Sequence, residues 1–230
     1  MQKNKVVVSV SGGVDSTTLV AYLLSRKFDV IGVSFIYGAK HNDYELEAAK
    51  KICEHYKIQH QIFDLTEAFA PFNSALLKTG EDIPEGHYNE ETMSQTVVPG
   101  RNIIFLSVLA GYAWSEKAAY IAIGIHAGDH FIYPDCRPQF YEAMSKAIIE
   151  GTDGNVSVIA PFVDLSKADI VSIGLELQVP YELTRTCYKM QEIACGRCGS
   201  CVERLEAFHL NGVEDPIEYE DRDYWKTTQK

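Results

Sequence analysis

The sequence has no long apolar run and little positive charge. The stretch 103–114 is its most apolar segment, well short of the roughly 20 apolar residues that a membrane-spanning helix needs. Lys and Arg total 21 against 32 Asp and Glu, a net charge of −11. A large nucleic-acid footprint requires clustered basic residues. We therefore expect neither a membrane nor a nucleic acid as a partner.

A secretory signal is also missing. The first five residues are basic, but the apolar run after them is short and ends at Gly12 and Gly13, unlike a signal peptide. Four of the six cysteines crowd into 187–201, which in a cytosolic chain favours metal binding over disulfides. We expect a cytoplasmic protein whose 230 residues form one core with a small appendage.

Alternating strand and helix patterns predict the fold class. A continuous β-branched run at 5–10 is typical of a buried strand, and helical spacing follows at 14–26. The same order continues with a strand, a helix and a strand at 29–37, 43–56 and 58–65. This order implies an α/β fold with a doubly wound, Rossmann-like parallel sheet. Further elements are expected at 101–116, 118–125, 137–150, 167–178 and 200–209.

The remaining segments complete the expected organisation. Ser166 and Asp169 are spaced as a capping box. The irregular stretch 80–100 is a candidate lid, because long loops in compact domains are usually functional. The acidic tail 214–223 is interpreted as solvated surface. We predict two domains, an α/β domain at 1–180 and a small helical module at 181–230.

A glycine turn at the end of the first predicted strand indicates a phosphate site. Parallel sheets bind ligands at the carboxyl ends of their strands, and a helix N-terminus offers free N–H groups to an anion. The turn lacks the lysine of the common nucleotide loop and the third glycine of the dinucleotide fingerprint. Its carboxylate would repel phosphate unless Mg²⁺ bridges the two, which favours Mg-bound polyphosphate. The predicted binding residues are Ser11, Gly12, Gly13, Asp15, Ser16 and Thr17.

The clustered cysteines Cys187, Cys195, Cys198 and Cys201 are spaced to surround one tetrahedral ion. Four thiolates leave no open coordination position, so we predict one structural Zn²⁺ per chain. An iron–sulfur cluster and reactive thiols are the alternatives. Cys53 is expected in the core, and we assign no chemistry to Cys136.

Three basic residues, Arg101, Arg137 and Lys167, follow loops that can converge on the mouth of the sheet. There they would neutralise polyphosphate or a substrate carboxylate; surface salt bridges are the alternative for each. Lys167 is unfavourable in the first turn of a helix, which suggests that another interaction holds it. The loop residues His126, Asp129 and His130 are a weak metal signal and fit a pocket lining better.

Several motifs carry a resemblance to known proteins. SGGVDSTT at 11–18 resembles the pyrophosphate loop of the adenine-nucleotide α-hydrolases, which cleave ATP to AMP and pyrophosphate. Within that superfamily, the chain resembles the 7-cyano-7-deazaguanine synthase family along its whole length. The matching segments are YGAKH at 37–41, VPGRN at 98–102, YPDCR at 133–137, SKAD at 166–169, and TCY followed by CGRCGSC.

This resemblance implies ATP-dependent conversion of 7-carboxy-7-deazaguanine and ammonia to the nitrile in queuosine biosynthesis. Acyl-adenylate and amide intermediates are implied, with 1–180 as the ATP-binding domain and 181–230 as the zinc-binding module. We also expect a homodimer. Asp15 would share Mg²⁺ with ATP, and Asp135 would act as a base. Charge stabilisation would come from Arg101, Arg137 and Lys167, and substrate binding from Tyr37, His41, Arg101, Asn102 and Arg137. Glu45, one helical turn after His41, faces either the site or solvent.

The chain departs from the family pattern at Val14 and in AGDHFI at 127–132. These departures keep two related products open, the amide and a conjugate with another amine. A tRNA-modifying enzyme of the same superfamily is a further alternative, although it would need a basic face. A non-catalytic nucleotide-binding or zinc-mediated interaction protein is the alternative from another class.

Overall fold

A five-stranded parallel sheet forms the centre of the molecule. The computed structural model describes residues 2–78, 80–86, 95–129 and 133–228. The strand order is β3-β2-β1-β4-β5, and every neighbouring pair is parallel. The strands are β1 (Gln2–Ser9), β2 (Asp29–Ile36), β3 (Gln59–Asp64), β4 (Ala118–Ala122) and β5 (Ser157–Ile159). The chain winds outward from β1 to β3 and then returns to β4, so the winding direction reverses between β1 and β4.

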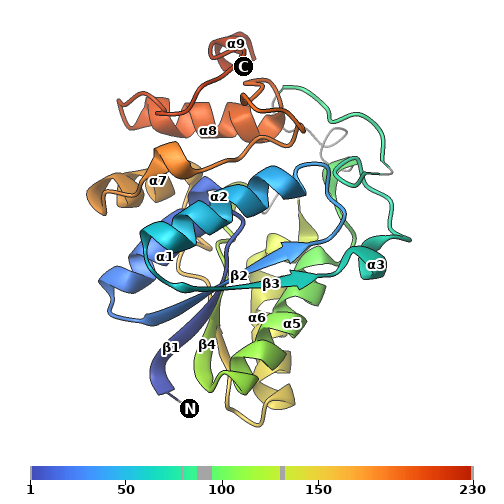
Figure 1. The fold of residues 1–230 in the computed structure, drawn as a ribbon, viewed down its shortest axis with the longest axis vertical. Helices are drawn as coiled ribbons and strands as arrows, with labels where there is room; N and C mark the ends of the chain where they lie inside the picture. The colour runs from blue at the N-terminus through green and yellow to red at the C-terminus, as the bar shows by residue number, and fades with distance from the viewer. Residues whose placement is uncertain (1, 79, 87–94, 130–132, 229–230) are drawn as a thin grey trace.

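Helices cover both faces of this sheet (Figure 1). On one face lie α5 (Arg101–Ser115) and α6 (Pro138–Gly151), and on the other lies α1 (Val14–Ser25) with α7 (Lys167–Glu176) packed beside it. The remaining helices are α2 (Asn42–His55), α3 (Thr66–Phe69), α8 (Gly199–Leu210) and α9 (Tyr224–Thr227). The predicted doubly wound α/β fold is therefore confirmed. None of the helices in the described ranges combines the length and hydropathy of a membrane-spanning segment.

The two faces have separate apolar cores because successive side chains of a strand point in opposite directions. On β1, Val6 and Val8 are buried in the cluster that includes Leu19 of α1. Val7 between them is buried in the opposite cluster, with Leu109 of α5. All three valines are completely buried, which explains why this strand is uniformly apolar rather than alternating. The double-sided burial fixes β1, and with it the loop that follows.

Most predicted elements are present within one to three residues of their expected ends. The capping box is confirmed, because Ser166 Oγ accepts from Asp169 N at 3.2 Å and Asp169 Oδ2 accepts from Ser166 N at 2.9 Å. Two short elements, β5 and α9, carry too few residues for their periodicity to be read. The candidate lid lies partly outside the described residues, at 87–94, and both it and the domain boundary at 180 stay predictions.

The acidic tail at 214–223 is not solvated surface along its whole length, as the sequence suggested, because one of its residues is buried in an ion pair. Asp215 is completely buried at its side chain and pairs with the equally buried Arg204 of α8, with Nε–Oδ2 at 2.6 Å and Nη2–Oδ1 at 2.8 Å. Arg204 also donates to Thr184 Oγ1 at 2.8 Å and to Tyr181 O at 3.3 Å. Tyr219 Oη donates to Asp215 Oδ2 at 2.6 Å. One buried ion pair thus joins α8, the 181–184 turn and the tail.

Replacing Asp215 with Asn is expected to lower the free energy of unfolding by about 3–5 kcal/mol, because it leaves a buried guanidinium uncompensated. Urea unfolding measures this loss. Asp223→Asn is the matched control, since the Asp223 side chain is 76% exposed in its pair with Lys226; a change within about 0.5 kcal/mol is expected there. Equal losses in the two variants would contradict the structural role of the buried pair.

Candidate active site

A cavity of about 220 Å³ lies at the carboxyl ends of the strands, where the winding reverses. Residues that follow β1 and β4, among them Ser11 and Gly124, form one part of its lining. Parallel α/β sheets bind ligands at this point of their topology. The segment after residue 180 contributes Arg185, Thr186, Tyr188, Ser200 and Glu203. Both predicted domains therefore supply residues to one site.

The turn after β1 has the geometry expected of a phosphate loop. Gly12 has φ of +78°, and a Cβ there would lie 2.6 Å from Ala48 Cβ, so only glycine fits. Its carbonyl accepts from Arg185 N at 2.8 Å. No side chain caps the N-terminus of α1, which leaves its amide groups available to an anion. Four predicted residues, Ser11, Gly13, Asp15 and Ser16, line the cavity. Gly12 and the completely buried Thr17 are not among its lining residues.

Lys167 bridges two carboxylates of the cavity. Its Nζ lies 2.8 Å from Asp15 Oδ2 and 3.1 Å from Glu203 Oε2, which supplies the interaction expected to hold a lysine at this end of α7. Burial alone would raise the pKa of Asp15, but Lys167 and His126 outweigh it and hold the pKa below its ordinary value. Asp15 Oδ1 is buried and has no hydrogen-bond partner. A free carboxylate oxygen beside a phosphate loop suits a divalent cation.

A second group of side chains lines the cavity beyond β2. Tyr37, His41 and Arg101, all predicted substrate residues, meet there with Glu45 and Tyr188. His41 is 1% exposed; burial, and then the charges of Arg101 and Arg185, lower its pKa to about 3, so the imidazole is neutral at physiological pH. Burial raises the pKa of Glu45 to about 7 despite the charge of Arg101.

Asp135 supports Arg101 from outside the cavity lining. Its Oδ2 accepts from Asn102 N at 3.0 Å, and its carbonyl accepts from Asn102 Nδ2 at 2.9 Å. These bonds hold the first turn of α5, the helix that begins at Arg101. Within the described part of the chain, Asp135 and the exposed Arg137 are not among the lining residues. The base and charge-stabilising roles assigned to these two residues stay predictions.

Sequence reasoning missed Arg185 and Tyr188, which flank a cysteine of the predicted metal set. The Arg185 guanidinium lies 4.4 Å from the centroid of the Tyr44 ring and donates to Glu192 O at 2.6 Å. The ring centroids of Tyr188 and His41 are 5.1 Å apart. Their position next to Cys187 was the available signal, because ordering of the cysteine cluster also orders its neighbours.

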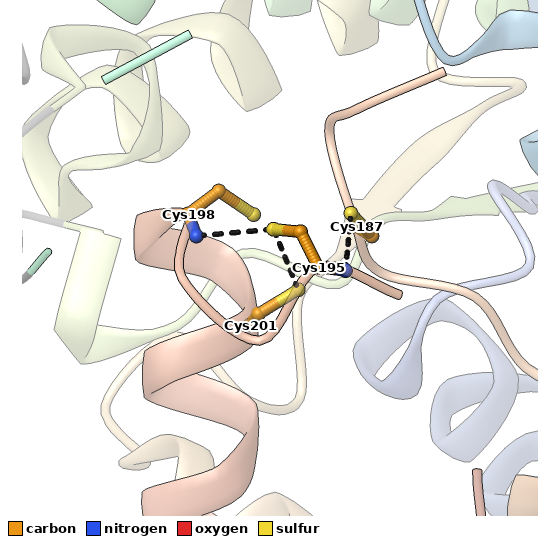
Figure 2. Close-up of side chains that lie close together, drawn as sticks. All are labelled: Cys187, Cys195, Cys198 and Cys201. Atoms are coloured by element: carbon orange, nitrogen blue, oxygen red, sulfur yellow. Dashed lines mark hydrogen bonds between the residues drawn. The ribbon is translucent and has the colours of Figure 1, made fainter. Parts of the chain in front are cut away.

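The four clustered cysteines converge as their spacing predicts (Figure 2). Cys187, Cys195, Cys198 and Cys201 are buried, and their sulfur atoms all lie within 4.8 Å of one another. A tetrahedral site with Zn–S bonds of about 2.3 Å would place sulfurs about 3.8 Å apart. Cys195 Sγ accepts from Arg197 N and Cys198 N, both at 3.3 Å. The cluster therefore has the composition and geometry of a metal site.

Local backbone and charge support this arrangement. Gly196 has φ of +73°, and a Cβ there would lie 1.8 Å from Asp221 O, so the turn between two ligands requires glycine. Hydrogen bonds within the cluster lower the pKa of Cys195 and raise the pKa of Cys198 and Cys201, so the sulfur atoms interact as one group. Of the other cysteines, Cys53 is buried in the core as expected, and Cys136 lines the active-site cavity.

The raised pKa of Glu45 predicts a pH-dependent stability. The folded chain binds a proton there up to about pH 7, whereas the unfolded chain releases it near pH 4.5, so this carboxyl destabilises the fold progressively as pH rises between those values. Glu45→Gln should therefore raise the unfolding free energy more at pH 8 than at pH 5. Denaturant unfolding at both pH values measures this; Glu47→Gln, 61% exposed at its side chain, is the control. Equal effects at both pH values would contradict the assignment.

Comparisons with known proteins agree with this geometry. A family model described as "Queuosine biosynthesis protein QueC" matches residues 5–212. The chain is 51% identical to a 7-cyano-7-deazaguanine synthase of Caldicellulosiruptor saccharolyticus, over 96% of this chain and 98% of the relative. It is 46% identical to that of Brucella ovis, over 98% of each chain. Among solved structures, NMN synthetase from Francisella tularensis is similar in fold, with a TM-score of 0.52 and 16% identity over 98% of this chain and 85% of that one. The chain therefore belongs to the QueC family of queuosine biosynthesis proteins.

Proposed function

We propose that the chain is an ATP-dependent 7-cyano-7-deazaguanine synthase, which converts 7-carboxy-7-deazaguanine and ammonia to the nitrile in queuosine biosynthesis. The family and the names of its relatives support this activity. One structural observation carries it: the phosphate loop and the unpaired Asp15 Oδ1 share a cavity with Arg101. ATP and a second, anionic substrate can therefore be held at one site.

The substrate carboxylate is a poor electrophile and must be activated before ammonia can attack it. Transfer of AMP to the substrate carboxylate releases pyrophosphate and gives an acyl-adenylate. Ammonia attacks the acyl carbon, a C–N bond forms, and AMP leaves with the electrons of the C–O bond to give the amide. A second AMP transfer to the amide oxygen, followed by loss of two protons and AMP, gives the C≡N bond. Two ATP are consumed for each nitrile.

One set of cavity residues would bind the phosphates of ATP, and another would bind the carboxylate of the second substrate. The loop 11–17 and the N-terminus of α1 would bind the departing pyrophosphate. Asp15 would hold Mg²⁺ through its unpaired Oδ1, and bound Mg²⁺ supplies charge neutralisation at the phosphates. Lys167 keeps Asp15 ionised and oriented. Arg101, with Tyr37 beside it, is the candidate for the substrate carboxylate.

We further propose that the cysteine cluster holds one Zn²⁺ with a structural role. Its four sulfurs satisfy tetrahedral coordination with no ligand left to water. Cytoplasmic location, a homodimer and the absence of a nucleic-acid partner complete the proposal. The net charge of −11 supports the last of these.

Product analysis tests the activity directly. The purified chain is incubated with Mg-ATP, ammonium and 7-carboxy-7-deazaguanine, and AMP and base products are quantified by mass spectrometry. Nitrile with two AMP per product is expected. Amide alone would mean that the reaction stops halfway, and AMP with neither product would indicate a different acceptor. No AMP from a folded sample would contradict the synthase assignment.

Asp15→Asn is expected to lower kcat about 10²-fold or more, because it removes the charged ligand of the Mg²⁺ that would neutralise the phosphates. It should also abolish the strengthening of ATP binding by Mg²⁺, measured by titration calorimetry with and without the metal. Asp43→Asn, at an exposed position of α2, serves as the control and should behave as wild type. Mg²⁺-dependent ATP binding that survives in Asp15→Asn would exclude the proposed metal-binding role.

Cys195→Ser is expected to reduce bound zinc from about one to near zero per chain and to lower the melting temperature, because metal binding at such a site is coupled to folding. Elemental analysis and thermal unfolding measure both. Cys53→Ala should keep its zinc, since that thiol lies in the α1-side core, away from the cluster. Iron with visible charge-transfer absorption in the wild-type chain would instead favour an iron–sulfur cluster.

A further inference from the structure

Glu45 lines the active-site cavity from the N-terminal part of α2. The neighbouring Asn42 begins α2, and its buried side chain ties this helix to the end of β2. Asn42 Oδ1 accepts from Tyr37 N at 3.0 Å and from Ala39 N at 2.9 Å, while Nδ2 donates to Phe35 O at 3.1 Å. Three bonds from one side chain set the position of the first helical turn. The helical turn that carries Glu45 into the cavity lining is therefore tied to the end of β2.

The hydrogen-bonding capacity of Glu45 is largely unused. Asp15 and Glu203, the other carboxylates that line the cavity, both contact Lys167. Glu45 has its closest described ion-pair partner in His41, at 3.6 Å from Nε2 to Oε2, and this imidazole is neutral. Within the described residues, no hydrogen bond reaches the Glu45 carboxylate. The Glu45 side chain is 22% exposed, and a carboxylate that is largely removed from water without donors is costly, so its presence in a ligand cavity points to donors on the ligand.

The surrounding cavity suits a planar heterocycle. Phe35 and Phe105, which are stacked with centroids 4.0 Å apart, both line it. The Tyr188 ring packs against His41 on the side of the C-terminal segment. Arg101 also lines the cavity, and its charge acts on Glu45. The pocket thus offers aromatic surface, one cation for an anionic substituent and one carboxylate that needs donors.

A guanine-type base matches this set of groups. Its pyrimidine edge presents the ring N1–H and the exocyclic 2-amino group side by side, and the two oxygens of a carboxylate can accept from both. We propose that Glu45 recognises the substrate base by accepting hydrogen bonds from N1–H and the 2-amino group, and so selects 2-amino-6-oxo bases over their 6-oxo analogues. This inference rests on the proposed function. It adds to that function a specificity-determining residue, with Arg101 left to the 7-carboxylate.

The test compares two bases that differ only in the 2-amino group, 7-carboxy-7-deazaguanine and 7-carboxy-7-deazahypoxanthine. Affinity is measured by titration calorimetry and kcat/KM for nitrile formation by mass spectrometry, on the full-length wild type and on Glu45→Gln. The wild type should prefer the guanine-type base about 10- to 100-fold, the effect of one hydrogen bond to a charged group. In Glu45→Gln this ratio should fall to about one, with the change mainly in KM. Glu47→Gln, exposed on the same helix, should keep the wild-type ratio.

The outcomes separate the inference from the proposed function. A wild type that makes nitrile from both bases equally, or a Glu45→Gln variant that keeps the preference, overturns the role of Glu45 alone. A folded wild type that makes no nitrile overturns the synthase assignment and the inference with it. If Glu45→Gln does not fold, Glu45→Asp, which keeps the carboxylate but retracts it by one methylene, should bind the guanine-type base less tightly and discriminate less. Unchanged discrimination in Glu45→Asp counts against the proposal.

Discussion

The ion pair between Lys167 and Asp15 holds the active site together. Asp15 belongs to the first turn of α1, Lys167 begins α7, and the second partner of the lysine, Glu203, lies on α8. A single ammonium therefore fixes the phosphate loop relative to the two helices that follow the sheet. It also keeps Asp15 ionised despite burial and leaves Oδ1 free. The proposed binding of Mg-ATP depends on this arrangement.

The cysteine cluster acts on the same cavity from the other side. Cys187 follows Arg185 and Thr186 directly and precedes Tyr188, and all three of these neighbours line the cavity. Arg185 N also donates to Gly12 O at 2.8 Å, so the phosphate loop and the cysteine segment are joined by a backbone hydrogen bond. A structural metal would therefore stabilise more than its own module, because it orders one wall of the substrate site.

The sequence was sufficient for the elements with strong local patterns. β1 is uniformly apolar because both its faces are buried. Gly12 in the turn after it has a positive φ, which glycine adopts readily, so the residue type itself indicates the turn. The cysteine spacing predicted the cluster for the same reason. The sequence left Glu45 open between the site and solvent, gave no sign of Arg185, and led us to interpret the tail with Asp215 as solvated surface. Long-range packing decides whether a charged side chain is solvated, paired or turned into a cavity. A run of acidic residues at 214–223 carries no local sign that Asp215 is buried.

The measurement that tests the account most directly follows the substrate oxygens. 7-Carboxy-7-deazaguanine labelled with ¹⁸O in both carboxylate oxygens is converted by the wild-type chain, and AMP is analysed by mass spectrometry. If the carboxylate and then the amide oxygen are adenylated, each of the two AMP molecules carries one ¹⁸O and pyrophosphate carries none. Unlabelled AMP, or label recovered in pyrophosphate or inorganic phosphate, would contradict activation by AMP transfer at this site.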